Sequence, residues 1–174
     1  MIFAIVGPSG AGKDTLIDGV IRARADLRLA RRVITRPAEA GGERFEGVTE
    51  AEFGLRRSRG DFALDWQAHG LRYAIPWQQI SGPGDVIFNG SRIALPAALT
   101  EFPDLRVILV TAPAAVLAER LVRRGRETAE DVHARLSRAA FALPAGIAAV
   151  TVENAGSPEA GIKALLDALQ PERA

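Results

Sequence analysis

The residues with the clearest chemical purpose stand near the start of the chain, in the run Gly7-Pro8-Ser9-Gly10-Ala11-Gly12-Lys13. Glycines at this spacing allow backbone dihedrals that side chains forbid, so peptide N–H groups can turn inward around an anion. Lys13 adds a full positive charge, and a helix that begins near Gly12 directs its partial positive end to the same place. The run predicts a loop that binds the phosphates of a nucleoside triphosphate, and the alternative is a turn that only joins a strand to a helix.

The residue after Lys13 departs from the usual pattern, in which Ser or Thr supplies a hydroxyl to Mg²⁺. Here Asp14 stands in that place, followed by Thr15. A carboxylate is a hard oxygen ligand, so we assign Asp14 to Mg²⁺, although an acid at a helix start is also stabilised by the helix dipole alone. The residues assigned to the donor nucleotide are Gly7, Pro8, Ser9, Gly10, Ala11, Gly12, Lys13, Asp14 and Thr15.

Strands and helices must position this loop, and the apolar pattern predicts where they lie. Continuous β-prone runs predict strands at residues 2–6, 32–35, 85–88, 107–110 and 150–152, with short strands or a strand and loop in 62–73. Helical spacing predicts helices at 12–25, 49–59, 93–99, 114–124, 129–143 and 159–169, and residues 38–47 read as irregular. Thr49 is the expected N-cap of the second helix, with Glu52 at the capping-box position. Strands that alternate with helices imply a mainly parallel sheet with helices on both faces, the three-layer α/β/α arrangement of a P-loop NTPase.

Composition bounds the remaining possibilities. The chain has 174 residues, 48% hydrophobic and 25% charged, which suits a single domain spanning residues 1–174. A net charge of +1 gives no support for nucleic-acid binding, and the absence of cysteine excludes disulfides and thiolate chemistry. No apolar stretch reaches the length of about 18 residues that a membrane span needs, so we expect a cytoplasmic protein without a membrane partner.

Three segments resemble the guanylate kinase group of P-loop kinases. Ile34-Thr35-Arg36-Pro37 resembles the phosphate-gripping stretch of that group, and the segment from Phe62 through His69-Gly70 to Tyr73 resembles its acceptor-binding segment. The run Arg120-Leu121 to Arg124-Gly125-Arg126-Glu127, with Arg135 and Arg138 after it, resembles its arginine-bearing lid. The resemblance implies a guanylate kinase-like fold with an acceptor-binding insertion at about residues 35–80 and a lid at about 120–140.

Within that group the chain looks like the ribose 1,5-bisphosphate phosphokinases. The resemblance rests on the phosphate loop through Leu16, and on Val33 to Ala38 with Gly42-Glu43, Trp66 to Leu71, and Asn89-Gly90-Ser91-Arg92. It implies ATP-dependent phosphorylation of ribose 1,5-bisphosphate to 5-phosphoribosyl 1-diphosphate, with release of ADP, in phosphonate degradation. The small-molecule partner would then be a phosphorylated sugar, and the cofactors ATP and Mg²⁺.

The departures from guanylate kinase point the same way. Where that enzyme has a Glu that reads the guanine edge, this chain has Leu64, and a second acid is replaced by Gln67. An apolar side chain accepts no hydrogen bond from a base, so guanine recognition looks lost. The Mg²⁺-associated Asp of the central strand appears as Asn89 or Ser91, and we expect Asp14 to restore the missing carboxylate.

The resemblance also suggests a role for individual side chains. Thr35 and Arg36 suit the 5-phosphate of the acceptor, because a guanidinium offers two parallel donors to a dianion. His69, Tyr73 and Arg138 are further substrate-binding candidates; Arg124 and Arg135 join Lys13 as catalytic candidates; and Asn154 falls where the group forms its adenine pocket. No general base is needed, since the attacking phosphate oxygen is already deprotonated near neutral pH.

Two alternatives remain open at this stage. A guanylate kinase or another small-metabolite kinase would use the same scaffold. A non-catalytic module that binds a protein is the other, and such modules tend to lose the loop lysine that this chain keeps as Lys13.

Overall fold

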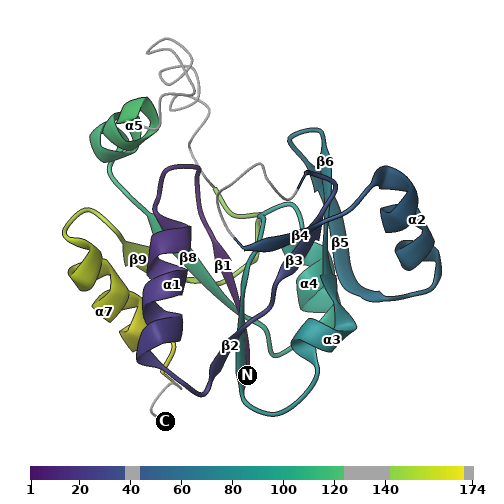
Figure 1. Ribbon diagram of the computed structural model, residues 1–174. Coiled ribbons are helices and arrows are strands. Elements are labelled where there is room, and N and C mark those ends of the chain that lie inside the picture. The colour runs from purple at the N-terminus through teal and green to yellow at the C-terminus, as the bar shows by residue number, and fades with distance from the viewer. Residues whose placement is uncertain (38–43, 124–141, 171–174) are drawn as a thin grey trace. The chain divides into compact units, whose positions relative to one another are not determined.

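The computed structural model describes residues 1–37, 44–123 and 142–170 (Figure 1). These residues form two compact units, one of Met1–Ala4 with Ala25–Arg106 and the other of Ile5–Arg24 with Val107–Ala174. Strand β1 (Ile2–Val6) begins in the first unit and ends in the second. The single kinase domain expected from the sequence stays a prediction.

The second unit contains the end of β1 and a short parallel sheet. Its strand order is β1-β8-β9, in which β8 (Arg106–Thr111) and β9 (Val150–Glu153) run parallel, with Ile108 opposite Val150. The core of β1 is fully buried, which explains why its sequence is apolar throughout rather than alternating. The helices of this unit are α1 (Lys13–Ala23), α5 (Ala114–Arg123) and α7 (Pro158–Ala168).

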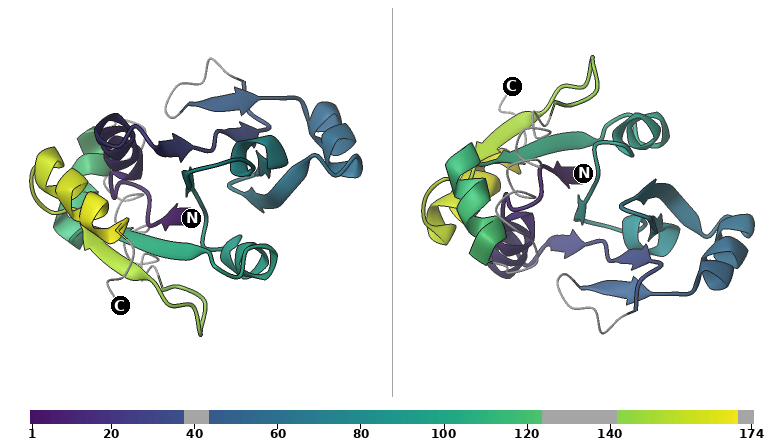
Figure 2. Two further views of the ribbon diagram at one scale, coloured as in Figure 1. Left: turned by 90° about the horizontal axis from the view of Figure 1, so that it is seen from below. Right: turned by 90° about the horizontal axis from the view of Figure 1, so that it is seen from above.

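Helices α1 and α7 lie side by side in both views (Figures 1 and 2), and α7 also packs against β9. Leu16, Ile17 and Val20 are buried on α1 as their helical spacing predicts, together with Gly19, whereas Ile21, which has the same spacing, is only partly buried. The start of α7 is well capped, because the Ser157 side chain accepts a hydrogen bond from the N–H of Ala160 (3.3 Å). Hydrogen bonds from its own backbone N–H and from Ser157 lower the pKa of Glu159 in the first turn.

The first unit holds two sheets. In one of them the start of β1 pairs with β7 in the order β2-β7-β1, and β2 (Leu27–Leu29) and β7 (Asp85–Asn89) run parallel. The other sheet has the order β4-β3-β6-β5, built from Phe45–Gly47, Arg32–Ile34, Leu71–Pro76 and Phe62–Ala68. In it β3 and β4 are parallel, while β3 with β6 and β5 with β6 are antiparallel. The helices are α2 (Glu50–Ser58), α3 (Trp77–Ile80) and α4 (Leu95–Glu101).

A tight hairpin joins β5 to β6. His69 and Gly70 form its two-residue loop, with φ angles of 51° and 72°. Two consecutive positive φ angles are the signature of a type I′ turn, whose twist matches that of paired antiparallel strands. The hairpin register then places Trp66 opposite Tyr73.

Helix α2 packs on the sheet β4-β3-β6-β5 of the first unit, and its residue Phe53 is completely buried there. Phe53 packs against Val33, Ala74, Val48 and Phe62, and its ring centroid lies 4.9 Å from that of Phe62. The helix begins as predicted, because the Thr49 side chain accepts a hydrogen bond from the N–H of Glu52 (3.1 Å). Phe53 therefore joins α2 to the strands β3, β5 and β6 through side-chain packing.

Several elements differ from the sequence-based expectation. Strict alternation of strands and helices is wrong for residues 27–76, where β3 to β6 form a mixed sheet and not βαβ crossovers. Strands β2 and β4 and helix α3 were not predicted, because three or four residues are too few to show periodicity. The irregular stretch at 38–47 is wrong at its end, which forms β4, and most of the helix expected at 129–143 lies outside the described residues.

The contact between α2 and its sheet gives a stability prediction. Phe53→Ala removes a fully buried ring and should lower the free energy of unfolding by about 3–5 kcal/mol. Leu55→Ala on the same helix is the matched control, since Leu55 is 51% exposed and its loss should change the value by no more than about 0.5 kcal/mol. Urea unfolding followed by circular dichroism measures both, and equal effects would contradict the packing described here.

Candidate functional site

The loop between β1 and α1 runs against the backbone of β8. A Cβ atom placed on Gly7 would collide with the carbonyl oxygen of Val110, so only glycine allows this approach. Gly10 and Gly12 have φ angles of 86° and 87°, in the left-handed region that glycine adopts without strain. Gly12 is the N-cap of α1 and provides no side-chain cap, so the first N–H groups of the helix face the loop. This is the geometry of a cradle for an anion.

Lys13, the first residue of α1, folds back over this loop. Its Nζ donates to the carbonyl oxygens of Gly7 (2.8 Å) and Pro8 (3.1 Å). Asp14 and Thr15 follow in the first turn and are both exposed. Within the described part of the chain, no group of three or more His, Cys, Asp or Glu side chains is arranged to hold a metal ion.

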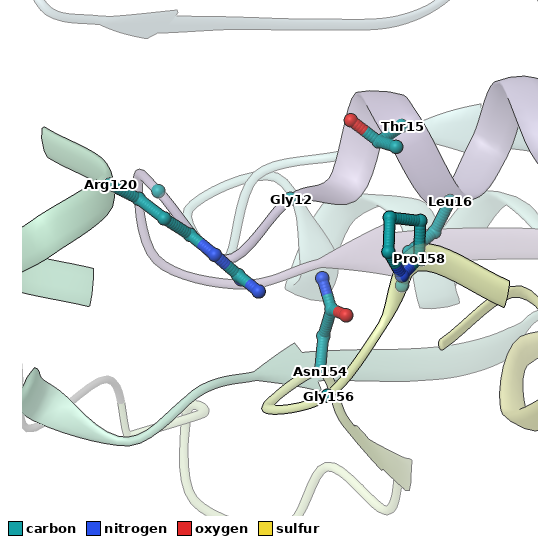
Figure 3. Close-up of a pocket in the computed structure, with 8 residues that line it drawn as sticks. Gly12, Thr15, Leu16, Arg120, Asn154, Gly156 and Pro158 are labelled. Carbon is teal, nitrogen blue, oxygen red and sulfur yellow. The ribbon is translucent and has the colours of Figure 1, made fainter. Parts of the chain in front are cut away.

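A pocket of about 340 Å³ opens beside the loop in the second unit (Figure 3). Its lining comes from the loop, from α1, from α5 and from the connection between β9 and α7: Gly10, Gly12, Thr15, Leu16, Arg120, Asn154, Gly156 and Pro158. Figure 3 shows the Arg120 side chain and the Asn154 amide approaching the loop beside Gly12 from two directions. The pocket thus adjoins the anion cradle and suits the remainder of a phosphate-bearing ligand.

Asn154 is one of the few buried polar side chains, with 5% of its surface exposed. Its backbone N–H donates to the carbonyl of Thr111 (2.7 Å), and its Nδ2 donates to the carbonyl of Ala11 (2.8 Å). Arg120 Nη1 lies 3.4 Å from the same oxygen of Ala11. The sequence assigned Asn154 to a nucleotide pocket, and the structure places it in the wall of a pocket beside the phosphate loop.

The candidate acceptor residues lie in the first unit. Thr35 follows β3, and its Oγ1 accepts a hydrogen bond from the N–H of Arg72 (2.9 Å) while its own N–H donates to the Arg72 carbonyl (3.0 Å). The Arg36 guanidinium lies over the ring of Phe45, 4.3 Å from its centroid. The backbone of Thr35 and the orientation of the Arg36 guanidinium are therefore both fixed by neighbouring strands.

Tyr73 belongs to a stack of side chains on the same sheet. Its ring lies parallel to that of Trp66, with centroids 5.5 Å apart and 7° between the planes, and the guanidinium of Arg32 lies 5.2 Å from the Tyr73 ring. His69 sits instead in the hairpin turn, where its positive φ serves the chain reversal. Thr35 and Arg36 thus directly follow β3, and Thr35 pairs with Arg72, the neighbour of Tyr73 on β6. Because successive side chains of a strand point to opposite faces, Thr35 and Tyr73 lie on different faces of this sheet, and His69 lies at the end of the hairpin.

Some of the predicted site residues lie outside the described part of the chain, and some residues of the observed site were not predicted. Arg124, Arg135 and Arg138 lie outside the described residues. The stacking Arg32, and Gly156 and Pro158 in the pocket wall, were not predicted. Arg32 could have been found as the one charged residue of an otherwise apolar strand, whereas nothing in the sequence marks Gly156 or Pro158.

The fold and the loop define the class of the protein. The chain superposes on guanylate kinase from Anaplasma phagocytophilum with a TM-score of 0.68 over 98% of this chain and 87% of that one, at 15% sequence identity. The chain therefore has a guanylate kinase-like P-loop α/β fold with a mainly parallel sheet, which confirms the expected fold class. No family model matches the chain. Among the described residues, no helix has the length and apolar character that crossing a membrane requires.

Sequence comparison defines the family. The chain is 49% identical over 177 residues to ribose 1,5-bisphosphate phosphokinase PhnN of Ruegeria sp. (strain TM1040), covering 99% of this chain and 93% of the relative. It is 43% identical over 175 residues to the protein of that name from Agrobacterium fabrum, covering 97% and 96%. The chain belongs to the ribose 1,5-bisphosphate phosphokinase family and is therefore a kinase.

A longer relative contains only one region that matches. The bifunctional ribose 1,5-bisphosphokinase-thymidine phosphorylase of Cupriavidus necator is 45% identical over 172 residues, which cover 97% of this chain. The chain spans 29% of the length of that relative. The similarity therefore concerns one part of the bifunctional protein.

The close approach of the loop to β8 gives a prediction for binding. Gly7→Ala places a methyl group against the Val110 carbonyl, so it should lower the free energy of unfolding by about 1–3 kcal/mol and displace the loop. Binding of inorganic tripolyphosphate, measured by calorimetry, should weaken about tenfold or more, since 1.4 kcal/mol corresponds to a factor of ten.

Gly60→Ala is the control for this substitution. Gly60 also has a positive φ (74°), but no atom lies within 4 Å of a Cβ placed there. Only backbone strain of about 1–2 kcal/mol is expected, with unchanged tripolyphosphate binding. Normal binding by Gly7→Ala would show that the close approach is not needed.

Proposed function

We propose that the chain transfers the γ-phosphoryl group of ATP to ribose 1,5-bisphosphate, producing 5-phosphoribosyl 1-diphosphate and ADP in phosphonate degradation. An oxygen of the acceptor's 1-phosphate forms the new bond to phosphorus, and the bond between that phosphorus and the β-phosphate bridging oxygen breaks. The observation that carries the proposal is the anion cradle beside the pocket, in a chain whose similarity to phosphokinases named for this acceptor spans 99% of its length. We place the reaction in the cytoplasm, where ATP is abundant.

The second unit supplies the donor site in this proposal. Backbone N–H groups of the loop bind the phosphate chain, apart from Pro8, which has none, and Ala11, whose N–H donates to the Pro8 carbonyl (3.3 Å). Lys13 neutralises charge that develops on the transferring group. Thr15 and the pocket beside Gly12 contact the rest of the nucleotide. Asp14, exposed in the first turn of α1, holds Mg²⁺ directly or through water, and the metal supplies charge neutralisation across the phosphates.

The first unit supplies the acceptor site. Arg36 binds the 5-phosphate through its two parallel N–H donors, and its position over Phe45 supports this role because the guanidinium plane is already oriented. The Thr35 hydroxyl accepts a bond from Arg72, which leaves its own proton for a phosphate oxygen. Tyr73 and His69 contact the sugar or its 1-phosphate. The stack on Trp66 supports Tyr73 in particular, because it fixes the ring.

Arginines complete the site in this proposal. Arg124 and Arg135 neutralise the transferring phosphoryl group, and Arg138 binds the acceptor. These three assignments rest on the sequence, because the three residues lie outside the described part of the chain. Water must be kept from the donor phosphate, since it competes with the sugar phosphate as acceptor.

The acceptor is tested by measuring ADP release with ribose 1,5-bisphosphate, GMP and gluconate as alternative acceptors. We expect kcat/KM for ribose 1,5-bisphosphate to exceed the other two by about 100-fold or more, because a site built for two phosphates leaves polar groups unpaired with the wrong ligand. Lys13→Met defines the background rate. Strong turnover of GMP with none of the bisphosphate would identify a guanylate kinase instead.

The role of Asp14 is tested separately through magnesium. Asp14→Ala, which leaves no oxygen ligand in this place, should raise the Mg²⁺ concentration that gives half-maximal activity by about 10- to 100-fold, the range seen when a residue that supports a metal is removed. Asp18→Ala is the matched control, because Asp18 is also exposed and lies one turn further along α1. Equal Mg²⁺ dependence of the Asp14 and Asp18 variants would mean that Asp14 only stabilises the helix start.

A further inference from the structure

The amide of Asn154 occupies a slot that only glycines leave open. A Cβ atom placed on Gly12 would lie 2.5 Å from Nδ2 of Asn154, and one placed on Gly161 would lie 2.6 Å from its Oδ1. Both distances are well below contact distance, so side chains at these two places would displace the amide. The slot joins three distant segments of the second unit: the phosphate loop, the end of β9 and the first turn of α7.

The hydrogen bond from this amide reaches the phosphate loop at a sensitive point. Nδ2 donates to the carbonyl oxygen of Ala11 at 2.8 Å. This hydrogen bond is buried, because only 5% of the surface of Asn154 is exposed. The carbonyl of Ala11 and the N–H of Gly12 belong to one peptide plane and point in opposite directions, because the peptide is trans. Fixing the carbonyl toward Asn154 therefore also fixes the direction of the Gly12 N–H.

The backbone of Asn154 is fixed as well. Its N–H continues the ladder between β8 and β9 by donating to the Thr111 carbonyl at 2.7 Å. An amide side chain on such a rigid support holds its partner in one orientation, whereas one on a free loop does not. Asn154 therefore transmits the position of the parallel sheet to the peptide between Ala11 and Gly12.

We infer that Asn154 is a positioning residue for the phosphate loop, and that it acts on the phosphate chain of the donor whatever base that donor carries. This inference rests on the proposed nucleotide site in the second unit and deepens it. A residue that only contacts adenine would affect ATP and leave a base-free phosphate chain unaffected. A residue that orients the Gly12 N–H affects both ligands by the same factor.

The test compares ATP with inorganic tripolyphosphate, which has no base or sugar. Asn154→Leu keeps the approximate size of the side chain, adds no charge and has no N–H to donate to Ala11. We expect both dissociation constants, measured by calorimetry, to rise by about 2- to 10-fold, the range for losing one hydrogen bond, because Arg120 Nη1 still lies 3.4 Å from the Ala11 carbonyl.

Gly161→Ala supplies an independent variant that leaves Asn154 in the sequence. Alanine favours a helix over glycine, so α7 itself should not be weakened. The new methyl group would lie 2.6 Å from Oδ1 of Asn154 and 2.8 Å from Cδ2 of Leu16, so it would displace the amide and the Leu16 side chain of α1. The same parallel loss of ATP and tripolyphosphate binding is expected. Thr151→Ala is the control for substitutions on this strand, because Thr151 is exposed on β9 and should leave both constants unchanged.

The outcomes separate this inference from the proposed function. If Asn154→Leu weakens ATP binding but binds tripolyphosphate like the unaltered chain, Asn154 reads the base and the inference is overturned. Unchanged binding of both ligands by both variants overturns it as well. If the unaltered chain binds neither ligand, the proposed donor site itself fails, and the inference fails with it.

Discussion

The backbone of the phosphate loop passes the end of β8 with no room for a side chain between them. This close approach of Gly7 to the Val110 carbonyl limits where the loop can lie, because any side chain at residue 7 would collide with β8. With the loop in this place, Lys13 donates to the carbonyls of Gly7 and Pro8, and Asn154 donates to that of Ala11. The geometry of the site thus begins with a backbone approach and not with a charged side chain.

The second unit holds the loop from two sides. On one side β8 limits the approach of Gly7, and on the other the segment between β9 and α7 contributes Asn154 and the wall of the pocket. The packing of α1 against α7 keeps these two sides together, since Gly19 lets Ile162 come close. Glycines at the contact points therefore allow segments to approach closely, whereas large apolar residues in the core hold the helices and strands in place.

In the first unit, aromatic rings orient the arginine side chains, whereas in the second unit glycines allow the close approach of segments. Arg36 lies over Phe45, and Arg32 and Trp66 lie against Tyr73, so the arginines of this sheet are oriented by stacking. A guanidinium held over a ring has its plane fixed before a ligand arrives, which suits the partly exposed Arg36 for recognition of an anion, whereas Arg32 is buried, with 9% of its surface exposed. Such a surface needs less ordering when a ligand arrives than freely moving side chains would.

Much of the fold could be predicted because its long elements carry strong signals. The apolar run at the start of the chain, the glycine loop and the capping residue Thr49 each gave the observed structure. The mixed sheet was not predicted, because β4 and β2 have three residues each and their partners are set by contacts far along the chain. The assignment of Asn154 to the nucleotide pocket came from resemblance alone, and its bond to Ala11 depends on a fold that no local pattern encodes.

The position of Lys13 has a consequence for the energetics of binding. With its ammonium already held by two loop carbonyls, the loop is closed on itself by a charge from its own sequence. In the proposed donor site, an incoming phosphate would replace those carbonyls as the partner of Lys13 and would meet a loop that is already ordered, because the entropy of ordering it is lost when the protein folds. A mutation that breaks the hydrogen bonds from Lys13 to the Gly7 and Pro8 carbonyls would therefore leave the loop less ordered in the folded protein. The entropy of ordering the loop would then be lost on ligand binding and not on folding.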